Sequence, residues 1–180
     1  MLQEAHIRAS ALNTINKFIK KHSKNTKIIA VTKTLSAQAV NGAIQNNITI
    51  IGENRVIEAE KKFNKYNQRK HIELHLIGHL QSNKTKKAVQ IFDVIQTVDS
   101  EKLIALIDKQ AAKEKKKQKI FLQINVGNDK KKFGFTPKEL QKKISTFVEF
   151  KNITIKGLMT ILPQDINKEQ AKEYYTQLKN

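Results

Sequence analysis

The sequence has 180 residues and no cysteine, and its 34 lysines and arginines against 16 acidic residues give a formal net charge of +18. This length suits one domain with a sizeable core, and the lack of cysteine excludes disulfides and thiolate metal sites. No run of about 18 apolar residues suggests a membrane span, and the first twenty residues show helical apolar spacing rather than a signal peptide. We therefore expect a cytoplasmic protein that has no membrane partner.

The positive charge raises the question of nucleic-acid binding, because clustered cations gain affinity by releasing counterions from phosphates. Only three of the basic residues are arginines, the side chain that best reads guanine edges and phosphates. The densest lysine runs are 113–119, where a helix should end and cations suit its dipole, and 130–132. We expect a lysine-rich surface without a specific nucleic-acid site; the alternative is a binding module whose affinity falls steeply with salt.

Hydrophobic patterning predicts an N-terminal helix over about 1–22, followed by six alternating strands and helices. The predicted strands are 28–32, 48–51, 72–77, 92–98, 120–126 and 153–159. The predicted helices are 37–46, 54–66, 82–90, 100–116, 137–149 and 167–178. Capping residues are expected at several helix starts, namely Ser36, Ser100, and Thr136 followed by Pro137.

Short, nearly continuous apolar strands separated by single helices indicate parallel βα units that are buried on both faces, an α/β fold. Two architectures fit six such units: an open doubly wound sheet, or part of a (β/α)₈ TIM-type barrel. The turn after the first strand reads Lys33-Thr34-Leu35-Ser36 instead of Gly-x-Gly-x-x-Gly, which argues against dinucleotide binding. No Walker motif, glycine-rich phosphate loop or metal-ligand cluster is present elsewhere in the sequence.

Lys33 is the most informative single residue, because it ends the apolar run 28–32 and begins a polar stretch. A lysine at the carboxyl end of a buried strand has its ammonium partly stripped of water, which makes the amine a better nucleophile toward aldehydes. Lys33 is therefore a candidate anchor for a Schiff base. The alternative is an ordinary lysine whose head group reaches solvent from a strand end.

Other polar or functional side chains also fall near the carboxyl ends of predicted strands. They include Asn54 after the second strand, His75 in the third, Asn125 near the end of the fifth and Met159 at the end of the sixth. Three of them have an ordinary alternative role: Asn54 as a helix start, His75 as a satisfied strand histidine, Met159 as core. Because barrels place their sites on this rim, their joint position favours a functional site.

Several segments resemble, in order and spacing from about Ile28 to Met159, the pyridoxal phosphate homeostasis proteins (the YggS/PROSC type). The segments are Val31-Thr32-Lys33, Gly52-Glu53-Asn54-Arg55-Val56, His75-Leu76-Ile77-Gly78-His79-Leu80-Gln81-Ser82-Asn83-Lys84, the Gln123 to Asn125 segment with Lys132-Phe133-Gly134-Phe135, and Gly157-Leu158-Met159. Within these, the pattern Ile-Gly-x-Leu-Gln-x-Asn-Lys is highly specific.

The resemblance implies a single-domain barrel similar to the N-terminal domain of alanine racemase, without that enzyme's second domain. It implies pyridoxal 5′-phosphate (PLP) held on Lys33 as an internal aldimine, with Asn54, His75 and Met159 at positions that line the cofactor pocket. It also implies a monomeric carrier or regulator of vitamin B6 and of amino- and keto-acid balance, without established catalytic turnover. Metal ligands and catalytic residues are not expected.

Members of this family continue with two further strands, which carry a Ser-Met-Gly-Met-Ser-like and a Gly-x-x-x-Val-Arg-Ile-Gly-like segment that bind the phosphate. The present sequence ends at Asn180, and neither segment has a counterpart. We therefore expect one PLP-binding domain over 1–180 that is truncated at its C-terminus, with about six of eight βα units, weakened cofactor affinity and open sheet edges able to self-associate. The alternatives are a truncated remnant with little binding, an assembly in which another chain supplies the missing strands, a C-terminal part that is encoded separately, and a fold-type III racemase or decarboxylase.

Overall fold

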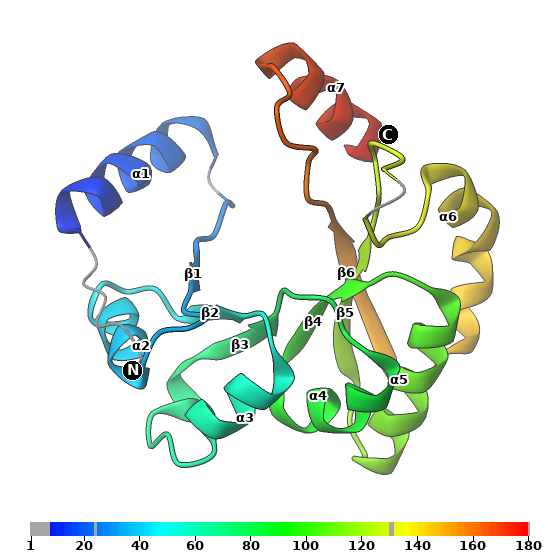
Figure 1. Cartoon of the computed structure of the whole chain (residues 1–180), viewed down its shortest axis with the longest axis horizontal. Helices are drawn as coiled ribbons and strands as arrows, with labels where there is room; N and C mark the ends of the chain where they lie inside the picture. The colour runs from blue at the N-terminus through cyan, green and yellow to red at the C-terminus, as the bar shows by residue number, and fades with distance from the viewer. Residues whose placement is uncertain (1–7, 24, 130–131, 180) are drawn as a thin grey trace. The chain divides into compact units, whose positions relative to one another are not determined.

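The computed structural model describes residues 8–23, 25–129 and 132–179, in which helices and strands alternate along the chain (Figure 1). The strands are β1 (Ile29–Val31), β2 (Ile50–Glu53), β3 (Glu73–Leu76), β4 (Val94–Val98), β5 (Gln118–Gln123) and β6 (Ile153–Met159). The α-helices are α1 (Ala9–His22), α2 (Ala37–Gln45), α3 (Val56–Phe63), α4 (Thr85–Ile91), α5 (Glu101–Lys113), α6 (Pro137–Lys143) and α7 (Lys168–Lys179). Short 3₁₀ helices are η1 (Arg69–His71), η2 (Ser82–Lys84) and η3 (Ile144–Glu149). Every predicted strand and helix is confirmed; the first seven residues of the predicted N-terminal helix lie outside the described part.

The strands form one sheet in the order β1-β2-β3-β4-β5-β6, so each strand lies beside its neighbours in sequence. Pairing is parallel between β1 and β2, between β4 and β5, and between β5 and β6. A doubly wound sheet reverses its strand order at a switch point, whereas a βα barrel proceeds in sequence. The doubly wound alternative is therefore wrong, and the sheet is of the barrel type, with β1 and β6 at the two ends of the strand order.

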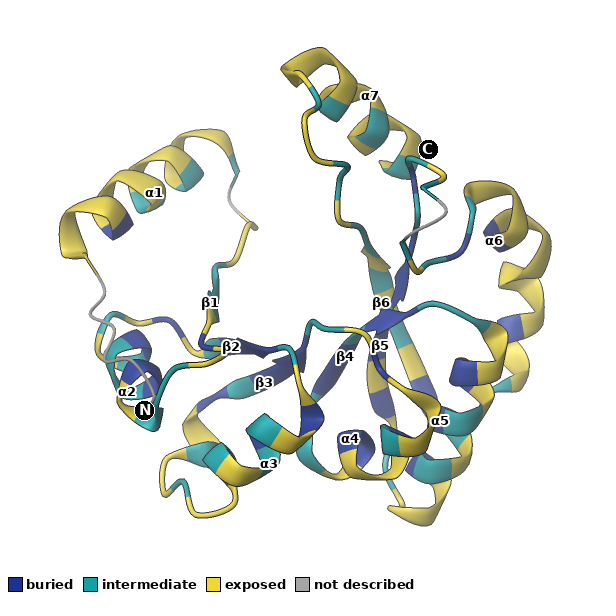
Figure 2. Ribbon diagram, viewed as in Figure 1, coloured by how far each residue is buried: buried dark blue, intermediate teal, exposed yellow. Residues whose placement is uncertain are grey.

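Contacts divide the chain into two compact units, residues 1–75 and 76–180. In the first unit, β1 pairs with β2 so that Val31 lies opposite Gly52. The core of this unit comes from the strands and from α2 and α3, with Val40, Ala43, Ile51 and Ala59 fully buried (Figure 2). The short β1 is less buried than β2.

In the second unit, the core is made by β4, β5 and the apolar face of α5, where Ile95, Ile104 and Ile120 are fully buried. Two helix starts carry the expected caps. The Ser100 hydroxyl accepts a hydrogen bond from the Leu103 N–H, and Thr136 forms a reciprocal capping box with the residue three positions later in α6.

Two expectations about these elements are wrong. Burial on both faces holds for β4, but β6 alternates between covered and exposed residues, because β1 and β6 stand at the ends of the strand order. Ser36 occupies the position before α2 but makes no capping hydrogen bond, and its hydroxyl is buried without a partner among the described residues.

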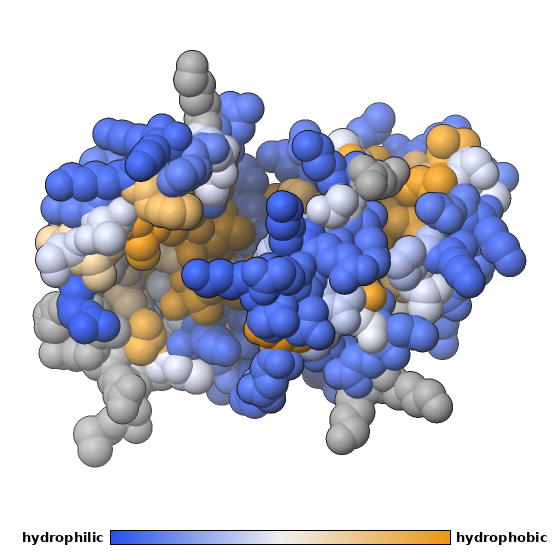
Figure 3. All heavy atoms as spheres, turned by 90° about the horizontal axis from the view of Figure 1, so that it is seen from above, coloured by the Kyte–Doolittle hydropathy of each residue, from blue (hydrophilic) through white to orange (hydrophobic). Residues whose placement is uncertain are grey.

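The face seen in Figure 3 is mostly hydrophilic, with hydrophobic side chains visible around a hollow at the left and in a second group at the upper right. Within the first unit, a cavity of about 310 Å³ is lined mainly by apolar residues of α1, of β1 and of the turn that follows it, among them Leu12, Ile15, Val31 and Leu35. None of the helices in the described ranges is long and apolar enough to cross a membrane. The same ranges contain no group of three or more histidine, cysteine or acidic side chains placed to hold a metal ion.

Candidate functional site

Lys33 lies on a tight turn that follows β1 directly. The Leu35 N–H donates to the Thr32 carbonyl at 3.1 Å, which closes a four-residue turn with Lys33 at its second position. The third position, Thr34, has a φ of 62°, a region that β-branched residues rarely adopt. The lysine is therefore carried by a strained, hydrogen-bonded turn rather than by the strand itself.

The Lys33 side chain is exposed, and its amine forms no hydrogen bond or ion pair with any residue that the structure describes. The expected partial removal of its ammonium from water is therefore wrong for this structure. The reason is local: β1 ends at Val31, and the turn carries the lysine beyond the buried part of the strand. An exposed primary amine without a partner is accessible to a small aldehyde.

Asn54 and His75 lie near the carboxyl ends of the next two strands. Because the Thr32 N–H donates to the Gly52 carbonyl at 3.0 Å, continuing this register places Asn54 level with Lys33. Asn54 lies in a half-buried bend after β2, and the capping position of α3 falls on Arg55 instead. The first unit thus brings these side chains to consecutive strand ends, as the sequence predicts.

The His75 ring is buried in β3, with 5% of the residue exposed, and its Nε2 lies 2.9 Å from a carboxylate oxygen of Glu73. Leu74 and Leu76, the neighbours on either side, are fully buried, so strand alternation places His75 on the opposite face from them. His75 therefore has the partner that a structural strand histidine requires, and it lies one residue before the carboxyl end of β3.

Met159 belongs to the second unit, where it is the last residue of β6 and half-buried. Its carbonyl accepts a hydrogen bond from the Ile124 N–H at 2.8 Å, and it lies opposite Gln123 in the parallel ladder. The structure thus confirms its position at a strand's carboxyl end.

A buried polar network lies on the helix side of β1 and β2, and sequence reasoning missed it. The Lys62 ammonium, on α3, donates to a Glu53 carboxylate oxygen at 2.5 Å and to the Thr32 carbonyl at 2.6 Å. The Thr32 hydroxyl donates to the same carboxylate oxygen at 2.6 Å. Glu53 is 0% and Lys62 8% exposed. A charged residue ending an apolar strand was the available signal for Glu53, whereas Lys62 was one of many lysines.

In the second unit, the motif residue His79 packs against two residues from other segments. Its ring stacks on Phe133 with centroids 3.7 Å apart, and its Nδ1 lies 3.1 Å from a carboxylate oxygen of Asp99. The preceding Gly78 carbonyl accepts a hydrogen bond from the Thr97 hydroxyl at 2.6 Å. These contacts fix the start of the segment that resembles the family most closely.

The loop after β5 is held against the strand that precedes it. The Phe135 N–H donates to the Gln123 carbonyl at 2.8 Å, and the Asn125 N–H donates to the Phe135 carbonyl at 2.9 Å. Gly134 lies between these bonds with a φ of +131°, and a Cβ there would stand 2.8 Å from the Asn125 nitrogen and 3.0 Å from the Gln123 oxygen. Both the conformation and the space at this position therefore require glycine.

Gly134→Ala is expected to lower the free energy of unfolding by about 2–4 kcal/mol, because it adds backbone strain and a clash with backbone atoms. Urea denaturation followed by circular dichroism measures the change. Gly42→Ala is the matched control: nothing lies within 4 Å of its added Cβ in α2, and it should stabilise by about 0.5–1 kcal/mol. Equal effects of the two substitutions would contradict the loop geometry.

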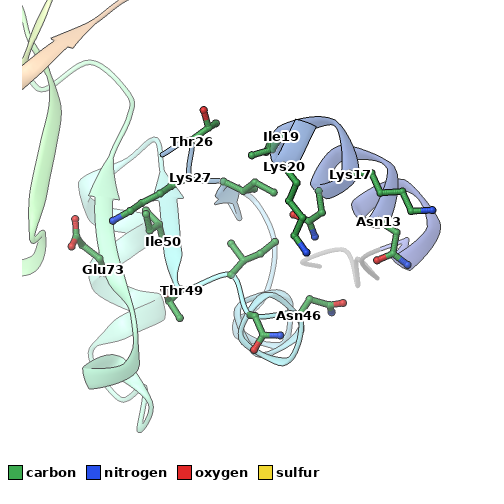
Figure 4. A pocket seen from close by; sticks show the side chains of 14 residues that line it. Asn13, Lys17, Ile19, Lys20, Thr26, Lys27, Asn46, Thr49, Ile50 and Glu73 are labelled. Carbon is green, nitrogen blue, oxygen red and sulfur yellow. The ribbon is translucent and has the colours of Figure 1, made fainter. Parts of the chain in front are cut away.

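A polar cavity of about 690 Å³ opens at the other end of the strands in the first unit (Figure 4). It is lined by α1, by the segment before β1, by the loop between α2 and β2 and by the starts of β2 and β3, with Lys17, Lys20, Lys27, Asn46 and Glu73 among its side chains. None of the candidate residues on the rim contributes to it. The site predicted from the sequence and this cavity are therefore separate features.

Comparison with known proteins gives a consistent result. Residues 7–180 match the family model of the alanine racemase N-terminal domain. The pyridoxal phosphate homeostasis protein of Buchnera aphidicola (subsp. Schizaphis graminum) is 35% identical over 162 residues, which cover 88% of this chain and 70% of that protein. The protein of the same name from Synechocystis sp. is 33% identical over 156 residues, covering 87% of this chain and 72% of that protein.

Solved structures agree with these matches. PipY of Synechococcus elongatus, determined with PLP bound, superposes with a TM-score of 0.82 at 29% identity, over 91% of this chain and 76% of that chain. Alanine racemase of Clostridium difficile superposes with a TM-score of 0.76 at 14% identity, over 93% of this chain and 44% of that chain, which shows the shared fold alone. The chain belongs to the alanine racemase N-terminal domain family and, within it, to the pyridoxal phosphate homeostasis proteins.

Proposed function

We propose that this protein binds PLP through a Schiff base on Lys33 and acts in vitamin B6 homeostasis. The observation that carries the proposal is the exposed Lys33 amine, presented on an anchored turn at the carboxyl end of β1. The names of the relatives and the PLP bound in PipY support it. We also propose that residues 1–180 form a single PLP-binding domain.

The residues present fit such a cofactor. PLP supplies an aldehyde that condenses with a lysine amine and a ring that withdraws electrons from what is attached. The chain supplies the amine of Lys33, which no described residue engages, and the Asn54 amide and His75 ring at adjacent strand ends. Met159, at the end of β6 in the second unit, is the fourth proposed site residue.

We further propose that the protein does not turn over amino acids. Racemisation or decarboxylation on PLP requires a general acid or base that is available to move a proton. In the described first unit, the Lys62 ammonium is buried and held by Glu53, and the buried His75 ring is bonded to Glu73 on its own strand, so neither is a free second acid or base beside Lys33. Amino and keto acids are then ligands of the loaded protein rather than substrates.

Absorbance spectroscopy of the purified 180-residue chain with added PLP tests the binding proposal. We expect a band near roughly 420 nm that borohydride converts into a stable adduct, and peptide mapping should place the adduct on Lys33. Adducts spread evenly over many of the surface lysines would overturn the proposal.

Incubation of the loaded chain with a panel of L-amino acids, followed by chiral chromatography, tests the absence of turnover. Enantiomer ratios and amino-acid concentrations should stay constant. Steady conversion of any amino acid would establish instead the fold-type III enzyme that the sequence leaves open.

A further inference from the structure

The residue before Lys33 is held at three points. The Thr32 N–H donates to the Gly52 carbonyl, and its hydroxyl donates to the buried Glu53 carboxylate at 2.6 Å. Its carbonyl accepts two hydrogen bonds, one from the Leu35 N–H at 3.1 Å and one from the Lys62 ammonium at 2.6 Å. Through these two hydrogen bonds, the Thr32 carbonyl links α3 with the turn on which Lys33 lies.

The ion pair that supplies this clamp is not explained by stability alone. Burying two charges costs desolvation that their attraction seldom exceeds, so an apolar pair of similar volume would serve the core at least as well. The second Glu53 carboxylate oxygen is also buried without a partner among the described residues, which adds to the cost. The buried Lys62–Glu53 pair therefore calls for a role other than stabilising the core.

The turn itself needs an external hold. Thr34 has a positive φ, which costs a β-branched residue of the order of 1–3 kcal/mol and persists only where surrounding contacts fix the backbone. Without the Lys62 hydrogen bond, the Thr32 carbonyl would keep only the Leu35 N–H, and the turn could relax. Relaxation would move the Lys33 backbone, because Lys33 lies between the two ends of that hydrogen bond.

We infer that Lys62 and Glu53 are positioning residues for Lys33: Glu53 fixes the Lys62 ammonium, and the ammonium clamps the Thr32 carbonyl so that the strained turn presents the lysine amine. The value of this device for cofactor capture rests on the proposed function. The clamp itself is a property of the free protein and can be measured without PLP.

The first test is amide hydrogen exchange in the free protein, because the Leu35 N–H reports directly on the turn. The variant Glu53→Gln/Lys62→Met removes both charges together, which avoids leaving one charge buried alone. We expect the Leu35 amide to exchange roughly tenfold faster or more, as for a local opening that has become easier. The Leu103 amide, bonded to Ser100 in the second unit, should exchange at an unchanged rate.

Lys61→Met is the matched control, since Lys61 precedes Lys62 on α3, is exposed and carries the same charge. In this variant, the Leu35 amide hydrogen should exchange at the same rate as in the wild type. Unchanged Leu35 exchange in Glu53→Gln/Lys62→Met would overturn the inference whether or not PLP binds.

The second test follows the rate at which the borohydride-trapped adduct forms on Lys33 with PLP. Glu53→Gln/Lys62→Met should slow it by about 10- to 100-fold, as expected when a reacting group is displaced by about 1 Å. Adding Thr34→Gly should restore the rate to within a few-fold, because glycine adopts a positive φ without an external hold. Thr34→Ala, which retains the Cβ, should not restore it.

The outcomes separate the two proposals. A wild-type chain without a Lys33 adduct refutes the proposed function, and Leu35 exchange then still decides whether the clamp exists. A slow adduct rate that Thr34→Gly leaves slow would show that Lys62 does not act through the turn, and would overturn the inference.

Discussion

Lys33→Ala is expected to abolish the specific PLP adduct and to weaken PLP binding by about 100-fold or more, since the covalent bond to the amine is lost. The 420 nm band should disappear and peptide mapping after borohydride should find no dominant modified site. Lys33 is exposed and its side chain has no partner among the described residues, so the unfolding free energy should change by less than about 0.5 kcal/mol. The loss would then be chemical rather than structural.

Lys27→Ala is the matched control for this experiment. Lys27 is exposed, belongs to the same unit and stands before β1, whereas Lys33 stands after it. The substitution removes the same charge at the opposite end of one short strand. PLP binding equal to wild type in Lys27→Ala, together with its loss in Lys33→Ala, would assign the site; equal binding in all three proteins would refute it.

The fold was accessible from sequence because its determinants are local. Apolar runs such as 48–51 and caps such as Ser100 act over a few residues, and sequential βα units leave few topologies. Errors arose at the ends of elements. β5 begins at Gln118, before its apolar run, because the Gln118 backbone pairs with β6 and its buried side-chain amide donates to the Phe92 and Asp93 carbonyls.

The two lysine runs also show how far local sequence patterns predict structure. The helix expected to end near the run 113–119 does so, since α5 ends at Lys113. In the run 130–132, the first two residues lie outside the described part, and the Lys132 ammonium donates to the Leu162 carbonyl at 2.9 Å. Composition alone predicts a solvated surface for such residues, yet this one has a specific partner 30 positions away.

The candidate site was predictable only in outline. Strand ends place Lys33, Asn54 and His75 on one rim, because parallel strands share the direction of their carboxyl ends. The exposure of Lys33 depends on a turn whose strained φ at Thr34 no propensity rule anticipates. The Lys62–Glu53 pair depends on how α3 packs on β2, and in a chain with 34 basic residues nothing distinguishes one lysine beforehand.

Lys62→Met is expected to destabilise the fold by about 3–5 kcal/mol, because it leaves the fully buried Glu53 carboxylate without its cation. Adding Glu53→Gln should recover most of this loss, to within about 1.5 kcal/mol of wild type. The glutamine side chain can still accept a hydrogen bond from the Thr32 hydroxyl, and it carries no charge. Urea denaturation of the wild type, both single variants and the double variant gives the coupling free energy directly.

Lys61→Met, on the exposed face of the same helix, should change stability by less than about 0.5 kcal/mol. If Lys62→Met behaved like Lys61→Met, the ammonium would not be buried against Glu53 in solution, and the clamp on the Thr32 carbonyl would have no basis. If the double variant is stable and Lys62→Met alone is not, an uncharged pair stabilises the fold about as well as the ion pair does. Its remaining role would then be the position of the turn that carries Lys33.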